Sequence, residues 1–322
     1  MATNTEPATP EIGPIRPLLR DVTLRDGLQD EAPIATEDKL LLYEALALAG
    51  VAELELTSFV RPDRVPAMAD AEALASATSG ASGPVRWALA LNTRGAERAM
   101  AAGLDHLQFV VSVSEEHSLE NAGMTTDTAL SEMESLVALA SASGAVVEVT
   151  LATSFGCPFS GPVPHARVLA TLDRALEAGV AGVGFGDTIG TAVPSEVRDL
   201  LRAAVARSGS IPIGAHLHDT RGLALANALA ALDAGAARID GSVGGLGGCP
   251  FAPGASGNLA LEDLVHALHA MGTATGIDLD RLIDAAGLAC RLVGRDVGSH
   301  VGKAGPRFAN TPFADRARAV AP

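Results

Sequence analysis

The chain is poor in aromatic side chains and in cysteine. Aromatic residues make up 3% of the 322 residues, whereas apolar residues together make up 48%. We therefore expect an aliphatic core built from Ala, Leu and Val. Three cysteines, Cys157, Cys249 and Cys290, are too few for a disulfide framework, and their spacing matches no zinc motif. This cysteine usage fits a reducing, cytoplasmic setting.

Positive charge and long apolar runs are also scarce. The 23 Lys and Arg residues face 38 Asp and Glu residues, for a formal net charge of −15, which disfavours nucleic acid or an anionic membrane surface as a partner. No apolar run approaches the ~20 residues that a transmembrane helix needs. Residues 1–15 lack the basic start and apolar stretch of a signal peptide, so we expect a disordered tail there. We expect residues 303–322 to be similarly loose.

Between these tails, short apolar runs alternate with longer helical patterns, which is typical of βα units and a parallel sheet. The eight runs cover residues 17–23, 52–58, 85–91, 106–113, 146–152, 182–187, 212–218 and 238–243. Five of the helical patterns end in a glycine just before the next run, as helix C-caps often do. These glycines are Gly50, Gly103, Gly144, Gly179 and Gly235.

Eight such repeats over roughly 250 residues predict an α/β fold, a (β/α)8 TIM barrel. No linker-like stretch divides the middle of the chain, so we expect one barrel domain over residues 16–302. A doubly wound open sheet is the alternative. Its dinucleotide-binding form is disfavoured because no Gly-x-Gly-x-x-Gly follows the first run.

Polar side chains gather where the predicted strands end, which in a TIM barrel is the face that carries the chemistry. Arg25 and Asp26 follow the first run, although adjacent Arg and Asp can also form an ordinary surface ion pair. Glu53 and Glu55 share one face of the second run. A buried carboxylate is costly without a partner, so these two either serve a site or are satisfied by Arg or Lys in a polar barrel layer. Asp187 ends the sixth run.

The seventh run ends in two histidines, His216 and His218. Residues at i and i+2 of a strand lie on the same face, as metal chelation by two imidazoles requires. The same pair could instead form a polar core layer. Asp26 and Asn258 favour a metal site, because each is predicted at the end of another strand. Nitrogen and oxygen ligands with open positions suit Mg²⁺ or Mn²⁺ better than structural zinc.

Residues 240–262 form a glycine-rich segment with seven glycines, a density that helices and strands tolerate poorly. Long loops of this kind in compact domains are usually functional. The segment carries Cys249 and then Asn258 just before a predicted helix. The alternative is a surface loop with an incidental thiol.

Several of these segments together resemble the 3-hydroxy-3-methylglutaryl-CoA lyase family of metal-dependent barrel lyases. The resemblance runs in the same order from about residue 20 to about residue 302. It rests on residues 25–29 (RDGLQ), 55–60 (ELTSFV), 186–190 (GDTIG), 216–220 (HLHDT), 247–250 (GGCP) and 257–259 (GNL). The cysteine loop is the specific element, since the Arg-Asp-Gly and His-x-His elements are shared more widely.

The resemblance implies four metal ligands, which are Asp26, His216, His218 and Asn258. It implies that Arg25 faces the thioester carbonyl of the substrate and that Cys249 is the catalytic thiol. Glu55 and Asp187 match further acidic residues of the family's site. Asp187 and His216 are the candidates to take the proton of the substrate's 3-hydroxyl.

The implied reaction is cleavage of 3-hydroxy-3-methylglutaryl-CoA, or a close 3-hydroxy-3-alkylglutaryl-CoA, to acetyl-CoA and a 3-oxo acid such as acetoacetate, as in leucine degradation. The implied partner is an acyl-CoA substrate, and we expect a homo-oligomer such as a dimer. The sequence departs from the family at several positions, among them Arg221 and Leu223, which replace the usual Tyr and Gln. These departures leave open which substituent the substrate carries on carbon three of its acyl chain.

Two other functions are compatible with parts of this pattern. An aldol- or Claisen-type condensing synthase of the same superfamily would share the Asp and His ligands. Such synthases generally lack the Gly-Gly-Cys-Pro loop and often carry an extra C-terminal region. A non-catalytic acyl-CoA-binding barrel would be favoured if Arg25, Cys249 or a metal ligand were missing, and all are present.

Overall fold

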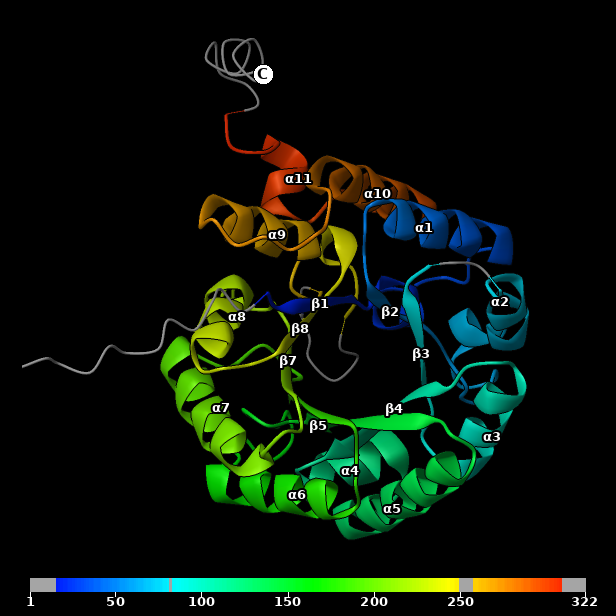
Figure 1. Cartoon of the computed structure of the whole chain (residues 1–322), viewed down its shortest axis with the longest axis vertical. Helices are drawn as coiled ribbons and strands as arrows, with labels where there is room; N and C mark the ends of the chain where they lie inside the picture. Colours follow the sequence, from blue (N-terminus) through cyan, green and yellow to red (C-terminus); the bar gives the residue numbers. More distant parts are fainter. Residues whose placement is uncertain (1–15, 81–82, 249–256, 309–322) are drawn as a thin grey trace, which may run out of the picture.

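The computed structural model describes residues 16–80, 83–248 and 257–308. Eight parallel strands form a closed barrel in which each strand pairs with its neighbour in the sequence and β8 pairs with β1 (Figure 1). The strands are β1 Leu18–Asp21, β2 Glu53–Ser58, β3 Val85–Leu89, β4 His106–Ser112, β5 Val146–Ala152, β6 Gly182–Asp187, β7 Ile213–Leu217 and β8 Arg238–Gly241. Each lies within one predicted run, so the predicted TIM barrel is confirmed.

Helices surround the barrel as an outer ring (Figure 1). They are α1 Thr36–Leu48, α2 Ala71–Ala77, α3 Thr93–Ala101, α4 Glu115–Ala122, α5 Thr126–Ala142, α6 His165–Glu177, α7 Pro194–Ser208, α8 Ala224–Asp233, α9 Leu261–Ala270, α10 Leu279–Leu292 and α11 His300–Ala304. The five predicted capping glycines have φ between 75° and 98°. This is the left-handed region that glycine adopts most readily, so each closes its helix as predicted.

Helix α11 continues through the predicted domain boundary at residue 302 and contacts α9 and α10. The barrel domain therefore includes at least part of the segment predicted to be loose. The predicted tail over residues 1–15, and residues 309–322, lie outside the described residues. Among the helices described, none is long and apolar enough to cross a membrane.

The barrel has an aliphatic layer outside the strands and a charged interior. Leu54, Val149 and Ile239 are fully buried and alternate along their strands with side chains that point inward. Inside, Nη2 of Arg20 lies 2.7 Å from Oε2 of Glu53. The polar barrel layer satisfied by Arg is thus confirmed as the explanation for Glu53, whereas the aliphatic core is confined to the strand–helix interface.

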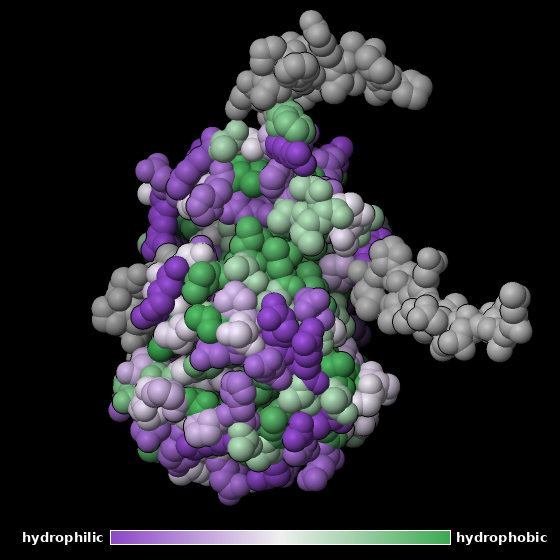
Figure 2. Space-filling view, turned by 90° about the vertical axis from the view of Figure 1, so that its left-hand side faces the viewer, coloured by the Kyte–Doolittle hydropathy of each residue, from purple (hydrophilic) through white to green (hydrophobic). Residues whose placement is uncertain are grey.

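Figure 2 shows one outer face of the molecule, where polar and apolar side chains are mixed and an apolar patch lies just above the middle. A cavity opens where α8, α9 and α11 meet, and Leu225, Ala267 and Val301 belong to its lining. None of the predicted site residues that the structure describes lines this cavity. The candidate site lies elsewhere, at the carboxyl ends of the strands.

Candidate metal centre and active site

The chain leaves β1 through a single turn of π-helix, η1 Thr23–Gly27, which carries Arg25 and Asp26. This turn is anchored from both sides. Asp21 accepts hydrogen bonds from the backbone N–H (2.9 Å) and the hydroxyl (2.8 Å) of Thr23. The Thr23 hydroxyl in turn accepts from the N–H of Val243 at 2.9 Å, in the segment after β8. The loops after β1 and β8 are therefore joined next to the barrel mouth.

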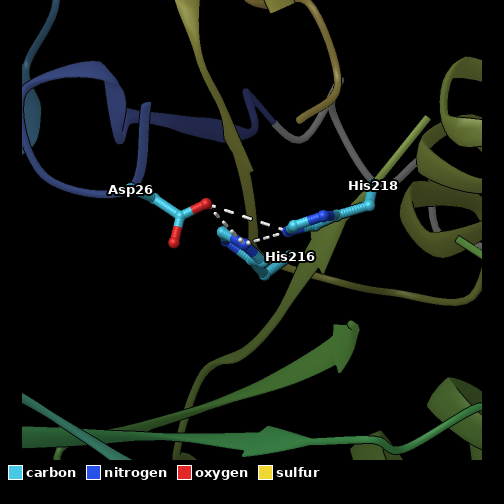
Figure 3. A group of neighbouring side chains, drawn as sticks. All are labelled: Asp26, His216 and His218. Carbon is cyan, nitrogen blue, oxygen red and sulfur yellow. Dashed lines mark hydrogen bonds and ion pairs between the residues drawn. The ribbon is translucent and has the colours of Figure 1, made fainter. Parts of the chain in front are cut away.

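The carboxylate of Asp26 points at the imidazoles of His216 and His218 (Figure 3). Its Oδ2 lies 3.7 Å from Nε2 of His216 and 3.8 Å from Nε2 of His218. The two Nε2 atoms are 3.3 Å apart. The prediction that both rings share one face is confirmed, because His216 is in β7 and His218 directly follows it.

Asn258 reaches the same point from the far end of the glycine-rich segment. Its backbone forms a bridge with His218. Its Nδ2 donates to Oδ2 of Asp26 at 2.7 Å and to the carbonyl oxygen of Leu246 at 3.0 Å. Gly247 has φ of 118°, and a Cβ there would collide with Nδ2 of Asn258. This close approach explains one glycine of the segment physically.

These side chains fit a divalent cation. One ligand atom from each of Asp26, His216 and His218 lies within 4.8 Å of the others. Oδ1 of Asn258 is buried and has no hydrogen-bond partner among the residues that the structure describes, so it can serve as a further oxygen ligand. Two imidazole nitrogens with carboxylate and amide oxygens form a donor set that suits Mg²⁺ or Mn²⁺.

The electrostatics of the group keep Asp26 ionised and leave one imidazole neutral near pH 7. Burial opposes ionisation of Asp26, but Arg25 and the two histidines outweigh it and hold the pKa of this carboxyl well below its usual range. Burial and the neighbouring His216 lower the pKa of His218 to about 4, so this ring is neutral near pH 7. A neutral imidazole beside a carboxylate is the state that binds a metal ion.

Arg25 is held between two carboxylates. Its Nε bonds the carboxylate of Glu55 and its Nη1 bonds that of Asp26. Glu55 is 1% exposed, so the Arg25–Glu55 pair is buried. The two contacts fix the plane of the guanidinium group beside the metal-binding side chains. Arg25, Glu55 and the four predicted metal ligands therefore converge as a single group.

Asp187 is not part of this group. Its two carboxylate oxygens accept hydrogen bonds from the backbone N–H groups of Thr191 at 2.9 Å and Ala192 at 3.1 Å, in its own loop. Burial raises the pKa of its carboxyl. Alternation along β6 explains the placement, since a Cβ at Gly184 would meet Arg238 in the interior and Asp187 has the opposite parity. These contacts favour a role in shaping the loop, and the catalytic role stays a prediction.

Two of the three cysteines, Cys157 and Cys290, lie within the described residues. Cys249 lies outside the described residues, so its predicted role as the catalytic thiol stays a prediction. Cys290 is buried in α10. Cys157 is buried in the loop after β5, where its Sγ accepts a hydrogen bond from the hydroxyl of Ser114 at 2.9 Å. Its contacts belong to loop packing.

Asp240 is a site residue that sequence reasoning missed. It lies in β8, is 2% exposed, and places Oδ2 3.4 Å from Nδ1 of His216. A signal was present in the sequence, because Arg238 and Asp240 are charged residues at i and i+2 of a strand. Such spacing puts both on the same face. Only the pairing of β7 with β8, which sets His216 opposite Asp240, shows what that face meets.

A second missed residue, Glu262, supports the start of the glycine-rich segment. Its carboxylate accepts the N–H of Gly244 at 2.9 Å. Burial raises the pKa of this carboxyl to about 7. The folded protein therefore holds a proton that the unfolded chain releases between about pH 4.5 and pH 7, and this contribution to stability is lost as pH rises through about 7.

We expect Glu262→Gln to weaken the pH dependence of stability. The free energy of unfolding should fall less between pH 5 and pH 8 than in the unsubstituted protein, by roughly 2 kcal/mol, because the amide does not ionise. Urea unfolding at the two pH values measures this difference. Glu97→Gln, at an exposed position of α3, is the control and should leave the difference unchanged. If the free energy of unfolding fell as much in Glu262→Gln as in the unsubstituted protein, the raised pKa of Glu262 would be contradicted.

Comparisons with known proteins identify the family of the chain. Residues 16–288 match the HMGL-like family. Hydroxymethylglutaryl-CoA lyase YngG of Bacillus subtilis is 39% identical over 274 residues, which cover 85% of this chain and 92% of that protein. The (R)-citramalyl-CoA lyase of Chloroflexus aurantiacus is also 39% identical, over 299 residues that cover 89% of this chain and 94% of the relative.

A solved structure is similar over nearly its whole length. It is an HMG-CoA lyase from Acinetobacter baumannii in complex with coenzyme A and 3-methylmalate, with a TM-score of 0.88 and 35% identity, and the match covers 92% of this chain and 97% of that one. The family match spans most of the present chain. The chain therefore belongs to the HMGL-like family and is an enzyme, a carbon–carbon lyase of the hydroxymethylglutaryl-CoA lyase type.

Proposed function

We propose that the protein is a divalent-metal-dependent lyase that cleaves 3-hydroxy-3-methylglutaryl-CoA, or a closely related 3-hydroxy-3-methyl acyl-CoA, to acetyl-CoA and an oxo acid such as acetoacetate. One observation carries the proposal. Asp26, His216 and His218 converge from two strand ends, and Arg25 is hydrogen-bonded beside them. This arrangement supplies a cation site and a fixed positive group within reach of one substrate.

Two acyl groups are candidates, because relatives are named for hydroxymethylglutaryl-CoA and for citramalyl-CoA. Both compounds carry a hydroxyl and a methyl group on carbon three of the acyl chain, together with a free carboxylate. They differ by one methylene between carbon three and that carboxylate. Cleavage between carbons two and three gives acetyl-CoA from both, with acetoacetate from the first and pyruvate from the second.

Arg221 is a reason to test both acyl groups. It replaces the tyrosine usual in the family and lies three residues after His218. Its Nη1 donates to the carbonyl oxygens of Ile189 at 2.9 Å and Gly190 at 3.0 Å. An arginine recognises carboxylates by paired hydrogen bonds that tyrosine does not make. A substrate carboxylate within reach of Arg221 would therefore meet a different partner than it would beside a tyrosine.

The metal would be held by Asp26, His216, His218 and Asn258, and when bound it would lower the pKa of the substrate's 3-hydroxyl as a Lewis acid. Of the two predicted acceptors for the hydroxyl proton, Asp187 is the one that remains, because His216 would bind the metal through Nε2 while its Nδ1 faces Asp240. Loss of this proton drives cleavage of the bond between carbons two and three. The electron pair passes to the acetyl-CoA half as its enolate.

Arg25 stabilises the charge that develops on the thioester oxygen of that enolate. Its guanidinium group is already fixed by Glu55 and Asp26, so little reorganisation is needed as the charge appears. The enolate carbon then takes a proton to give acetyl-CoA. We assign this proton to Cys249, the thiol of the glycine-rich segment, nine residues before Asn258 in the sequence.

The proposal is tested by product analysis with both acyl-CoA compounds. Protein loaded with Mg²⁺ is incubated separately with 3-hydroxy-3-methylglutaryl-CoA and with (R)-citramalyl-CoA, and acetyl-CoA, acetoacetate and pyruvate are measured. We expect acetyl-CoA with acetoacetate from the first substrate. Pyruvate formation with a higher kcat/KM would assign the shorter acyl group. Absence of acetyl-CoA from both would contradict the proposed function.

We expect Cys249→Ala to lower kcat by about 100-fold or more, because a general acid or base typically contributes 10²- to 10⁴-fold. Metal affinity should stay within about threefold of the original, since the thiol is not a proposed ligand. Cys290→Ala is the matched control, because that thiol is buried in α10. Undiminished turnover by Cys249→Ala would overturn the role given to the thiol.

The predicted homo-dimer and cytoplasmic setting stay predictions. Size-exclusion chromatography with light scattering measures the former, and a molar mass twice that of the 32.6 kDa chain is expected.

A further inference from the structure

A chain of buried charges crosses the barrel interior behind His216. It begins at the imidazole, where Nδ1 of His216 lies 3.4 Å from Oδ2 of Asp240. The other oxygen of Asp240 accepts the Nε–H of Arg238 at 2.8 Å. All members are polar or charged side chains whose strands line the barrel. The interior charge chain consists of His216, Asp240, Arg238, Glu148, Arg20 and Glu53.

The far half of the chain anchors Arg238. Nη1 of Arg238 forms an ion pair with Glu148. The same carboxylate oxygen accepts the Nη1–H of Arg20 at 2.8 Å. Arg20 is 0% exposed, and its guanidinium group lies 3.9 Å from the centre of the Trp87 ring. Arg238 is thus held by a carboxylate of β5 that is also bound by Arg20 of β1, the strand next to β8.

Glycines in β6 and β7 leave the room that this arrangement needs. A Cβ at Gly214 would lie 3.0 Å from Nε of Arg238, and a Cβ at Gly184 would lie 2.9 Å from its Nη2. On the other side of the chain, a Cβ at Gly182 would lie 2.8 Å from a carboxylate oxygen of Glu148. Larger side chains at these positions would displace the charged groups from their present contacts.

The two proposed metal-binding imidazoles differ in the surroundings of their Nδ1 atoms. Nδ1 of His216 faces Asp240, whereas Nδ1 of His218 is buried without a hydrogen-bond partner within the described part of the chain. The interior charge chain therefore acts on one histidine only. His218 serves as an internal comparison for the effect of a carboxylate on Nδ1.

We propose that Asp240 is a positioning residue that holds His216 with Nδ1 protonated and the lone pair of Nε2 directed to the metal, and that Arg238 keeps Asp240 in place. This inference rests on the proposed metal site. A carboxylate that accepts the N–H of one ring nitrogen fixes both the tautomer and the plane of the ring, and it raises the basicity of the other nitrogen. Arg238 prevents Asp240 from turning away, because it occupies the second carboxylate oxygen.

The test is Asp240→Asn, which keeps the size of the side chain. The amide oxygen should retain the hydrogen bond from Arg238, so that the NH₂ group faces His216. An NH₂ group there needs Nδ1 as an acceptor, which moves the ring proton to Nε2. We expect Mn²⁺ binding, measured by electron paramagnetic resonance, to weaken about 10- to 100-fold.

Nitrogen-15 NMR of the histidines in metal-free protein gives a readout that loss of stability alone does not change. In the original protein Nδ1 of His216 should carry the proton, and in Asp240→Asn Nε2 should carry it. The signals of His218 should report the same tautomer in both proteins. This measurement tests Asp240 even if Mn²⁺ does not bind, an outcome that would instead count against the proposed metal site.

Lys39→Met is the matched control for breaking a buried ion pair. Lys39 is 2% exposed and pairs with Asp70 between α1 and α2, with no link to His216. We expect lower stability in Lys39→Met with Mn²⁺ affinity within about twofold of the original. Unchanged Mn²⁺ affinity together with an unchanged His216 tautomer in Asp240→Asn would overturn the proposal.

Arg238→Lys tests whether Arg238 keeps Asp240 in place. Lysine keeps the charge but not the fork that engages Asp240 through Nε and Glu148 through Nη1. We expect Mn²⁺ affinity between those of the original protein and Asp240→Asn. Affinity equal to the original would show that Asp240 needs no anchor and would contradict the role given to Arg238.

Discussion

Asp26→Asn should weaken Mg²⁺ and Mn²⁺ binding by at least about 100-fold and remove nearly all lyase turnover. Oδ2 of Asp26 lies within 3.8 Å of Nε2 in both histidines and is the anionic member of the ligand group. Two unit charges about 4 Å apart interact by about 4 kcal/mol at an effective dielectric constant near 20. That energy corresponds to a factor of about 10³ in affinity, so a 100-fold loss is a lower bound.

Asp30→Asn is the control for this substitution. It removes the same charge four residues further along, from a carboxylate outside the ligand group. Isothermal titration calorimetry should show Mn²⁺ affinity within about threefold of the original for Asp30→Asn, because a more exposed charge is screened. Comparable affinity in Asp26→Asn and Asp30→Asn would mean that the cation binds elsewhere.

Arg25→Met should lower kcat by about 10²- to 10³-fold without weakening metal binding. Removal of a single group that stabilises a developing oxyanion typically has an effect of this size. The expected effect on metal affinity is opposite to that of Asp26→Asn. Arg25 is a cation bonded to the ligand Asp26, so its loss should leave Mn²⁺ affinity unchanged or raise it. Steady-state kinetics together with calorimetry separates the two effects.

Arg174→Met provides the comparison for Arg25→Met. Arg174 also pairs with a carboxylate, that of Glu134 at 2.5 Å, but it lies in α6 of the outer ring and its partner lies in α5. Its kcat should stay within about twofold of the original. If Arg25→Met lost metal affinity in proportion to activity, Arg25 would support the ligand group and would not act on the thioester oxygen.

The barrel could be predicted from the sequence because its local signals agree with one another. Each strand lies within a predicted apolar run. Gly50, Gly103, Gly144, Gly179 and Gly235 all adopt positive φ before the next strand. Such agreement between local propensity and global fold is what makes a fold readable from its sequence. The strand ends were less predictable, since β1 and β8 are shorter than the runs that contain them.

The ligand group could be predicted in part because a strand has a fixed period. His216 and His218 share a face whatever surrounds them. Asp240 could not be found in this way, because its role depends on the register that sets it opposite His216 in the neighbouring strand. The same period of two explains why Asp187 lies apart from the ligand group. Its position in β6 directs the carboxylate away from the barrel interior and toward its own loop.

The apolar composition did not predict the charged interior of the barrel. An apolar share of 48% predicts an aliphatic core, and the strand–helix interface is aliphatic. Composition does not say which face of a strand is polar, so the buried pair of Arg20 and Glu53 inside the barrel appears only once the strands are closed into a ring. A charged interior of this kind is costly to assemble, and breaking one pair is more damaging than replacing both members.

The most direct test of the account is the metal dependence of acetyl-CoA release. Protein stripped with a chelator is assayed with 3-hydroxy-3-methylglutaryl-CoA and (R)-citramalyl-CoA before and after Mg²⁺ or Mn²⁺ is restored. We expect no release from the stripped protein, restored release on adding the ion, and no restoration in Asp26→Asn. Equal release with and without the ion would contradict a metal-dependent lyase built on Asp26, His216 and His218.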